Sequence, residues 1–138
     1  MRTRPTALVV EPDSSEAIST RKVVLETGKF NVITAHSIAE GFISMKQHRP
    51  EVLVIHAGVR DEDPSELVRS ARQSNEVFVV GLTVPGLDPV NGVDSELESN
   101  RPQQLLQLLV ETFGNPKNEI STVKPENPED ANRERQAS

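Results

Sequence analysis

The sequence contains no cysteine, tryptophan or tyrosine, and its only aromatic residues are four phenylalanines. Without cysteine there is no disulfide framework, no thiolate nucleophile and no cysteine-ligated metal site. So few aromatic side chains give nucleic-acid bases little to stack on. Basic residues are also outnumbered, 15 Lys and Arg against 21 Asp and Glu, which argues against binding a phosphate backbone. We therefore expect no direct contact with nucleic acid.

Long apolar runs are missing as well. No segment approaches the roughly 18 consecutive apolar residues of a membrane helix, and the apolar run at residues 7–10 is too short for a signal peptide. The length of 138 residues suits one ordinary domain. We expect a cytoplasmic protein that does not contact a membrane.

Short apolar runs alternate with segments of helical spacing along the chain. Four runs predict buried strands, and they are TALVV (6–10), FNVIT (30–34), EVLVI (51–55) and VFVVGL (77–82). Capping residues at Asp13, Ser37 and Asp63 each precede a glutamate by three residues and predict helices that start there. A further helix is predicted at 102–113. This alternation indicates an α/β protein with a parallel sheet covered on both faces.

The pattern breaks down between residues 83 and 99. Two prolines and two glycines in VPGLDPVNG (84–92) argue against a full helix there, and a short edge strand is expected near 93–97. From residue 115 onward, three prolines, mixed charges and few large apolar side chains cannot offset the entropy of ordering. We expect one domain at residues 1–114 and a disordered tail at 115–138.

Polar side chains collect where the predicted strands end. In an open parallel sheet, ligands and chemistry gather at the carboxyl ends of the strands. The residues at those ends are Glu11, Pro12 and Asp13 after the first strand, His56 and then Asp61, Glu62 and Asp63 after the third, Thr83 after the fourth, and Ser99 after the expected fifth.

Three of these stretches resemble the receiver domain of bacterial two-component response regulators. They are LVVEPDSS (8–15), EVLVIHAGVRDEDPSELV (51–68) and VVGLT (79–83), and the resemblance extends over roughly residues 5–114. It implies a flavodoxin-like three-layer sandwich with a five-stranded parallel sheet of order 2-1-3-4-5, here with the fourth helix shortened or missing. It also implies a site where an aspartate takes a phosphoryl group beside Mg²⁺.

The site residues implied by the resemblance have lost much of that chemistry. Glu11 and Pro12 fall on the acidic pair that helps to hold Mg²⁺, His56 on the phosphoacceptor aspartate, Thr83 on the switch hydroxyl and Ser99 approximately on a lysine. An imidazole cannot form an acyl phosphate, and proline offers no oxygen ligand to the metal. We expect no catalytic residue, no cofactor, and weak or lost Mg²⁺ binding, with Glu11 the residual metal candidate.

His56 itself is open to three interpretations. The first is a partly buried imidazole hydrogen-bonded to Glu11 or to a backbone group. In the second, Glu11 raises the pKa of His56, which would allow pH sensing. The third is a phosphohistidine relay. For the acidic run after the strand, we expect a solvated loop with Asp63 as a helix cap rather than a cation site.

The leading hypothesis is a pseudo-receiver, a signalling domain of a two-component phosphorelay that acts by protein–protein interaction without phosphorylation and is not an enzyme. Expected partners are a histidine kinase or an output protein, and a homodimer stays open. Two alternatives remain. One is a receiver phosphorylated on Asp61 or Asp63, and the other is a flavodoxin-like enzyme or cofactor binder.

Overall fold

The computed structural model describes residues 4–12, 16–74 and 76–114, with side chains in the first helix described from residue 20 onward. The elements in chain order are β1 (Thr6–Val10), α1 (Glu16–Thr27), β2 (Asn31–Ala35), α2 (Ile38–His48), β3 (Val52–His56), α3 (Pro64–Ser74), β4 (Phe78–Thr83), β5 (Ser95–Glu98) and α4 (Pro102–Phe113). The predicted Asp13 cap and the predicted tail at 115–138 lie outside the described residues.

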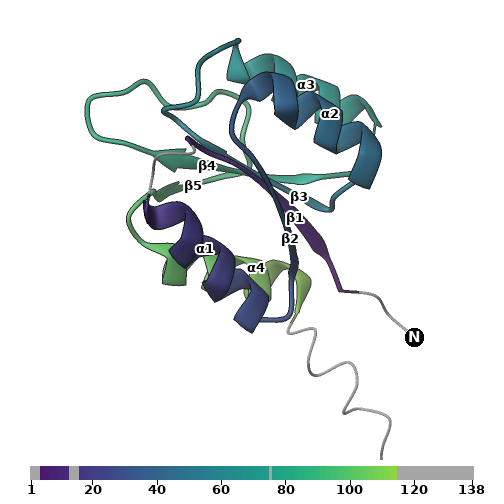
Figure 1. Ribbon diagram of the computed structural model, residues 1–138, viewed down its shortest axis with the longest axis vertical. Helices are drawn as coiled ribbons and strands as arrows, with labels where there is room; N and C mark the ends of the chain where they lie inside the picture. Colours follow the sequence, from purple (N-terminus) through teal and green to yellow (C-terminus); the bar gives the residue numbers. More distant parts are fainter. Residues whose placement is uncertain (1–3, 13–15, 75, 115–138) are drawn as a thin grey trace, which may run out of the picture.

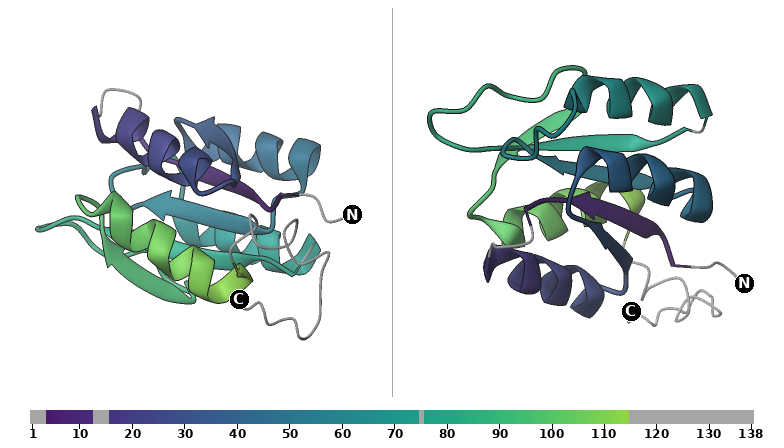
Figure 2. Two further views of the ribbon diagram at one scale, coloured as in Figure 1. Left: turned by 90° about the horizontal axis from the view of Figure 1, so that it is seen from below. Right: turned by 45° about the horizontal axis from the view of Figure 1, so that its top comes forward.

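The strands form one parallel sheet of order β2-β1-β3-β4-β5. Helices α2 and α3 cover one face, and α1 and α4 cover the other (Figures 1 and 2). The predicted three-layer fold and strand order are therefore confirmed. None of the helices in the described ranges is long and apolar enough to cross a membrane.

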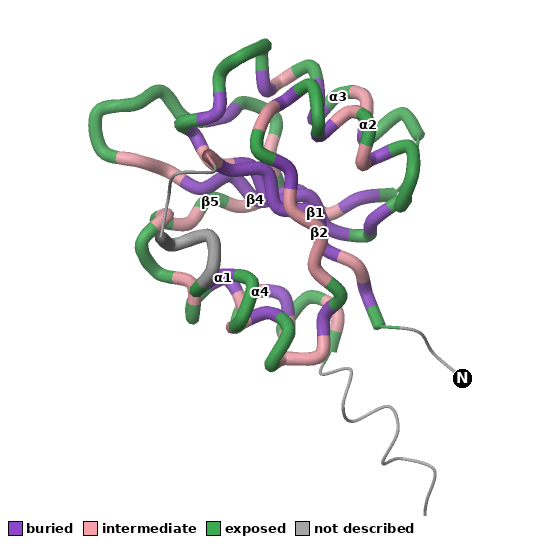
Figure 3. The backbone as a smooth tube through the Cα atoms, in the orientation of Figure 1, coloured by how far each residue is buried: buried purple, intermediate pink, exposed green. Residues whose placement is uncertain are grey.

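Two apolar cores lie on the two faces of the sheet. Alternate residues of a strand point to opposite faces, and a parallel sheet is buried on both. Leu8 and Leu53 accordingly pack under α2 and α3, whereas Val9 and Val54 pack under α1 and α4. The central strands are buried along their length (Figure 3). This burial fixes the position of the residues that follow each strand.

The connection from β4 to β5 replaces a helix. Residues 84–94 are all described and contain no helix, as the proline and glycine content predicted. Gly86 and Gly92 both have positive φ, which L-residues with side chains rarely adopt. Arg72 holds the end of this segment with a hydrogen bond to the Gly92 carbonyl (2.7 Å) and an ion pair with Asp94 (3.2 Å). The edge strand begins two residues later than expected, at Ser95.

The helix caps expected at Ser37 and Asp63 are present. Ser37 Oγ accepts a hydrogen bond from the Glu40 amide (3.0 Å), and Asp63 Oδ1 accepts one from the Ser65 amide (3.0 Å). Glu40 differs from the expected capping box, since its carboxylate accepts from the His36 amide (2.7 Å). These caps set where α2 and α3 begin, and so fix the loops at the carboxyl edge of the sheet.

Candidate functional site

The carboxyl ends of the strands bring the predicted site residues to one edge of the sheet. Glu11 and Pro12 follow β1, His56 is the last residue of β3, Thr83 is the last residue of β4, and Ser99 follows β5. The pairs β1–β3, β3–β4 and β4–β5 are all parallel neighbours. The edge therefore gathers five residues from four separate places in the sequence.

A buried ion pair occupies the centre of this edge. The side chain of Arg21, from α1, donates from Nε to Glu11 Oε1 (3.0 Å), and its Nη2 contacts the same oxygen. Both residues are fully buried, at 1% and 0% exposure. The third guanidinium nitrogen, Nη1, donates to the main-chain carbonyl of Ser99 (2.6 Å). One arginine thus links the residue after β1 to the residue after β5.

Sequence reasoning missed Arg21, although a signal was present. Arg21 stands four residues from both Ala17 and Leu25, and this spacing puts all three residues on one face of a helix. A cation on such a face must find an anion or several carbonyls, because an unpaired buried charge is very costly. Glu11 was the nearest acidic residue at a buried strand end.

His56 lies partly buried at the end of β3, with its ring turned to the following loop. Its Nδ1 accepts a hydrogen bond from the Gly58 amide (2.9 Å), which leaves the proton of the neutral ring on Nε2. This agrees with the expected bond to a backbone group. A Cβ atom built on Gly58 would lie 3.1 Å from His56 Nδ1 and 3.8 Å from Pro12 Cγ. Glycine is therefore the residue that lets this loop approach the ring.

The second interpretation of His56, in which Glu11 raises its pKa, is wrong. Burial lowers the pKa below the ordinary value, the Arg21 guanidinium lowers it further, and Glu11 raises it without reversing the shift. The main physical reason is burial, which disfavours the charged imidazolium, and Arg21 beside Glu11 offsets the attraction of that carboxylate. Since the depressed pKa lies below the ordinary 6.5, we infer that the ring is mainly neutral at pH 7.

Thr83 and Ser99 contribute little free chemistry to the edge. Thr83 Oγ1 donates to the carbonyl of Leu97 (3.4 Å), and the Ser99 amide donates to the carbonyl of Thr83 (3.0 Å). The Thr83 hydroxyl is thus directed to the neighbouring strand β5. Ser99 takes part through its backbone, where the resemblance implied a cationic side chain.

Three comparisons with known proteins give one positive result. No family model matches the sequence, and no curated protein matches it. The structure, in contrast, is similar to the CheY-like receiver domain protein from Methanospirillum hungatei, with a TM-score of 0.70, 18% identity, and coverage of 85% of this chain and 99% of that one. The chain has the fold of a response regulator receiver domain.

Two further solved structures support the receiver fold. One is the receiver domain of a sensor histidine kinase from Pseudomonas aeruginosa with a magnesium ion in its active-site cleft, at TM-score 0.67, 15% identity, and coverage of 79% of this chain and 97% of that one. The other is the pseudo-receiver domain of the CikA protein, at TM-score 0.58, 22% identity, and coverage of 78% and 95%. The resemblance read from the sequence is confirmed at the level of the fold.

The residues at this edge do not fit the Mg²⁺ ion of a phosphorylatable receiver. Mg²⁺ requires hard oxygen ligands in octahedral geometry. Glu11 Oε1 is taken by Arg21, Pro12 has no ligand atom, and His56 offers nitrogen. Within the described ranges there is no group of three or more potential metal-ligating side chains. Glu11 Oε2 is buried and has no hydrogen-bond partner among the described residues, but the adjacent guanidinium repels a cation.

The acidic loop after His56 serves as a set of helix caps. Asp61 Oδ1 accepts from the Ile38 amide (2.7 Å) and Oδ2 from the Ala39 amide (3.2 Å), so this loop caps α2, a different element. Hydrogen bonds from Ile38 and then Ala39 hold the pKa of Asp61 below its usual range. The Ser65 hydroxyl, followed by its amide, lowers the pKa of Asp63. The cap made by Asp61 was missed by sequence reasoning.

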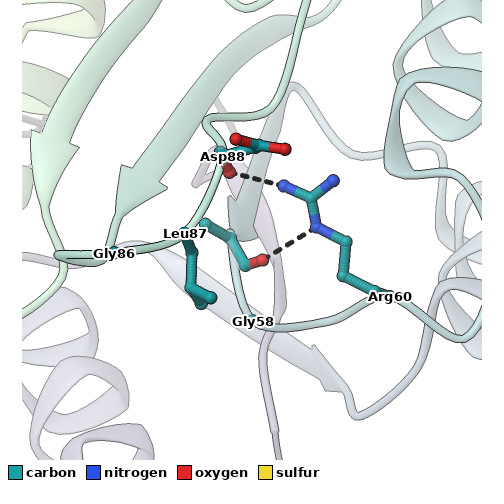
Figure 4. A pocket seen from close by; sticks show the side chains of 6 residues that line it. Gly58, Arg60, Gly86, Leu87 and Asp88 are labelled. Atoms are coloured by element: carbon teal, nitrogen blue, oxygen red, sulfur yellow. Dashed lines mark hydrogen bonds between the residues drawn. The ribbon is translucent and has the colours of Figure 1, made fainter.

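A pocket of about 300 Å³ opens between the β3–α3 loop and the β4–β5 connection. Its lining residues are Ala57, Gly58, Arg60, Gly86, Leu87 and Asp88 (Figure 4). Arg60 donates from Nε to the Ala57 carbonyl (3.0 Å) and from Nη2 to the Asp88 carbonyl (2.5 Å), as the dashed lines show. Arg60 therefore joins the two loops, and its positive charge is directed to backbone oxygens.

Proposed function

We propose that this chain is a receiver-like signalling domain of a two-component system that acts by binding other proteins and does not take a phosphoryl group. The observation that carries the proposal is the identity of the residue at the end of β3. His56 stands there, and its ring nitrogen Nδ1 is engaged by the Gly58 amide.

The chemistry of phosphoryl transfer supports this proposal. An acyl phosphate needs a carboxylate nucleophile and a divalent cation to offset the charge of the incoming group. At this edge the buried carboxylate, Glu11, is already paired with Arg21. The salt bridge with Arg21 neutralises the Glu11 carboxylate. His56, at the end of β3, has no carboxylate to offer. We therefore assign no enzymatic role to these residues.

Phosphorylation at another residue is the weaker candidate. Both oxygens of Asp61 accept backbone amides of α2, and Asp63 Oδ1 accepts from Ser65. Phosphorylating either aspartate would remove a helix cap. A flavodoxin-like enzyme or cofactor binder rests on fold analogy alone.

Partners of the proposed domain are a histidine kinase or an output protein. Helix α4 covers the sheet beside the edge strand β5, and residues 84–94 lie where a receiver of the predicted pattern has another helix. A partner surface in this region would consist of loop and strand rather than of two helices. Self-association into a homodimer is compatible with the same surface.

The test is an NMR titration with beryllofluoride and Mg²⁺, with a phosphorylatable receiver domain as positive control. We expect no saturable amide shifts around His56 and Thr83, because β3 ends in an imidazole and the Glu11 carboxylate is paired with Arg21. Saturable shifts at those amides would contradict the proposal.

Phosphorylation elsewhere is tested by mass spectrometry after incubation with acetyl phosphate. The wild-type protein is expected to gain no phosphoryl group. A gain that disappears in Asp61→Asn or in Asp63→Asn would support the alternative candidate instead.

A further inference from the structure

The side chain of Arg21 links three separate parts of the chain. It belongs to α1, it binds the carboxylate of Glu11 after β1, and it binds the carbonyl of Ser99 after β5. The bond to Ser99 spans 78 positions of the sequence. Among the described residues, Arg21 is the one side chain of α1 that forms a hydrogen bond to the β5–α4 connection.

The position of the guanidinium gives these contacts a functional meaning. The resemblance to receivers implies two cations at this edge, a metal ion near the acidic pair and a lysine after the fifth strand. Here the acidic residue is neutralised from inside the protein, and the backbone at the expected lysine position, Ser99, is held by the same guanidinium. The planar fork of arginine can bind both groups at once, whereas the single ammonium of lysine is a point charge.

Burial makes this arrangement persistent. Arg21 and Glu11 are withdrawn from water, so salt screens their attraction much less than that of an exposed pair. Opening the Arg21–Ser99 bond would leave a buried donor without a partner, which is unfavourable. The Ser99 amide is also bonded to the Thr83 carbonyl, so the anchored segment is continuous with the end of β4.

We propose that Arg21 is an internal cationic latch that holds the β5–α4 connection, residues 99–101, against β1 and α1 in one fixed arrangement. The latch takes the place of a metal ion and of a cationic side chain after β5. A partner protein that binds this edge would therefore bind a surface of constant conformation. The inference goes beyond the proposed function, because it concerns the conformation of the edge and not the transfer of a phosphoryl group.

Three variants test the latch. Arg21→Lys keeps a positive charge for Glu11 but removes the fork that reaches Ser99. The double variant Glu11→Leu with Arg21→Met replaces the buried pair by apolar side chains of similar size, a change that buried ion pairs often tolerate. Arg69→Met is the matched control, since Arg69 also binds a glutamate, Glu66, but on the exposed surface of α3.

The measurement is amide hydrogen exchange at residues 99–101, compared with the amides of α2 and α3 in the same protein. We expect exchange at Ser99 and Arg101 to be at least about tenfold faster in Arg21→Lys and in the double variant, with α2 and α3 unchanged. Arg69→Met should match the wild-type protein at all of these amides.

Wild-type protection of Ser99 and Arg101 in either Arg21 variant would overturn the inference. If the double variant fails to fold, Arg21→Lys alone decides, because it retains the buried charge pair. The beryllofluoride titration uses the wild-type chain and a different readout. The titration would therefore reveal failure of the proposed function, and hydrogen exchange would reveal failure of the latch, each independently of the other.

Discussion

Removing the Arg21 side chain should cost this domain a large part of its stability. In Arg21→Met, the Glu11 carboxylate stays fully buried and loses its only described side-chain partner. Breaking a buried ion pair in this way typically costs about 3–5 kcal/mol. The carbonyl of Ser99 also loses a donor, which adds roughly 1 kcal/mol.

This loss can be compared with the total free energy of unfolding of the domain. A domain of this length is stable by about 5–15 kcal/mol, so Arg21→Met should remove between a quarter and all of that. The double variant Glu11→Leu with Arg21→Met removes the unpaired charge together with its partner. Its stability should return to within about 2 kcal/mol of the wild-type value, since apolar replacements of buried pairs are often neutral or stabilising.

Urea unfolding followed by circular dichroism measures these differences from the midpoint at constant m-value. Arg69→Met removes an exposed pair and should leave the free energy of unfolding nearly unchanged. The reasoning would be refuted by a loss below about 1 kcal/mol in Arg21→Met. It would also be refuted if the double variant were as unstable as the single one, because the penalty would then not come from the buried carboxylate.

Three further predictions concern the surroundings of the site. Asp61→Ala should lower the free energy of unfolding by about 1 kcal/mol through loss of the α2 cap, whereas Glu62→Ala, in the same loop, should leave it nearly unchanged in urea titrations. Gly41→Val should cost about 1–3 kcal/mol by overpacking, because even a Cβ atom at Gly41 would lie 2.8 Å from Leu67 Cδ2; the thermal midpoint reports this. His56 should titrate below 6.5 when its ring carbon shifts are followed by NMR. Because its pKa is lower in the folded state than in the unfolded one, stability should fall as the pH drops below about 6.5 towards that lower pKa, and a titration midpoint above 6.5 would contradict this.

Local patterns in the sequence were enough to predict most of the fold. The apolar runs gave the strands because fully buried parallel strands have few polar residues. Ser37 and Asp63 marked the starts of α2 and α3 because their side chains bond amides only two or three residues away. Pro85, Gly86 and Gly92 correctly argued against a helix between β4 and β5, since glycine and proline act on the backbone at their own positions.

Some residues of the candidate site could likewise be placed from the sequence. The placement of His56 and Thr83 followed from the sequence, because a parallel sheet presents the ends of its strands along one edge. The sequence alone determined which element each residue ends, and that a histidine ends β3.

Tertiary structure decided which groups meet at that edge. The contacts of Arg21 with Ser99 and of Asp61 with Ile38 join residues 78 and 23 positions apart. Helical and strand periodicities describe only a residue's own element, so they carry no information about such partners. The direction of the His56 pKa shift also depended on the fold, because it comes first from burial of the ring and then from the Arg21 guanidinium. Burial and charge are properties of the folded neighbourhood, and the fold alone brought this arginine into it.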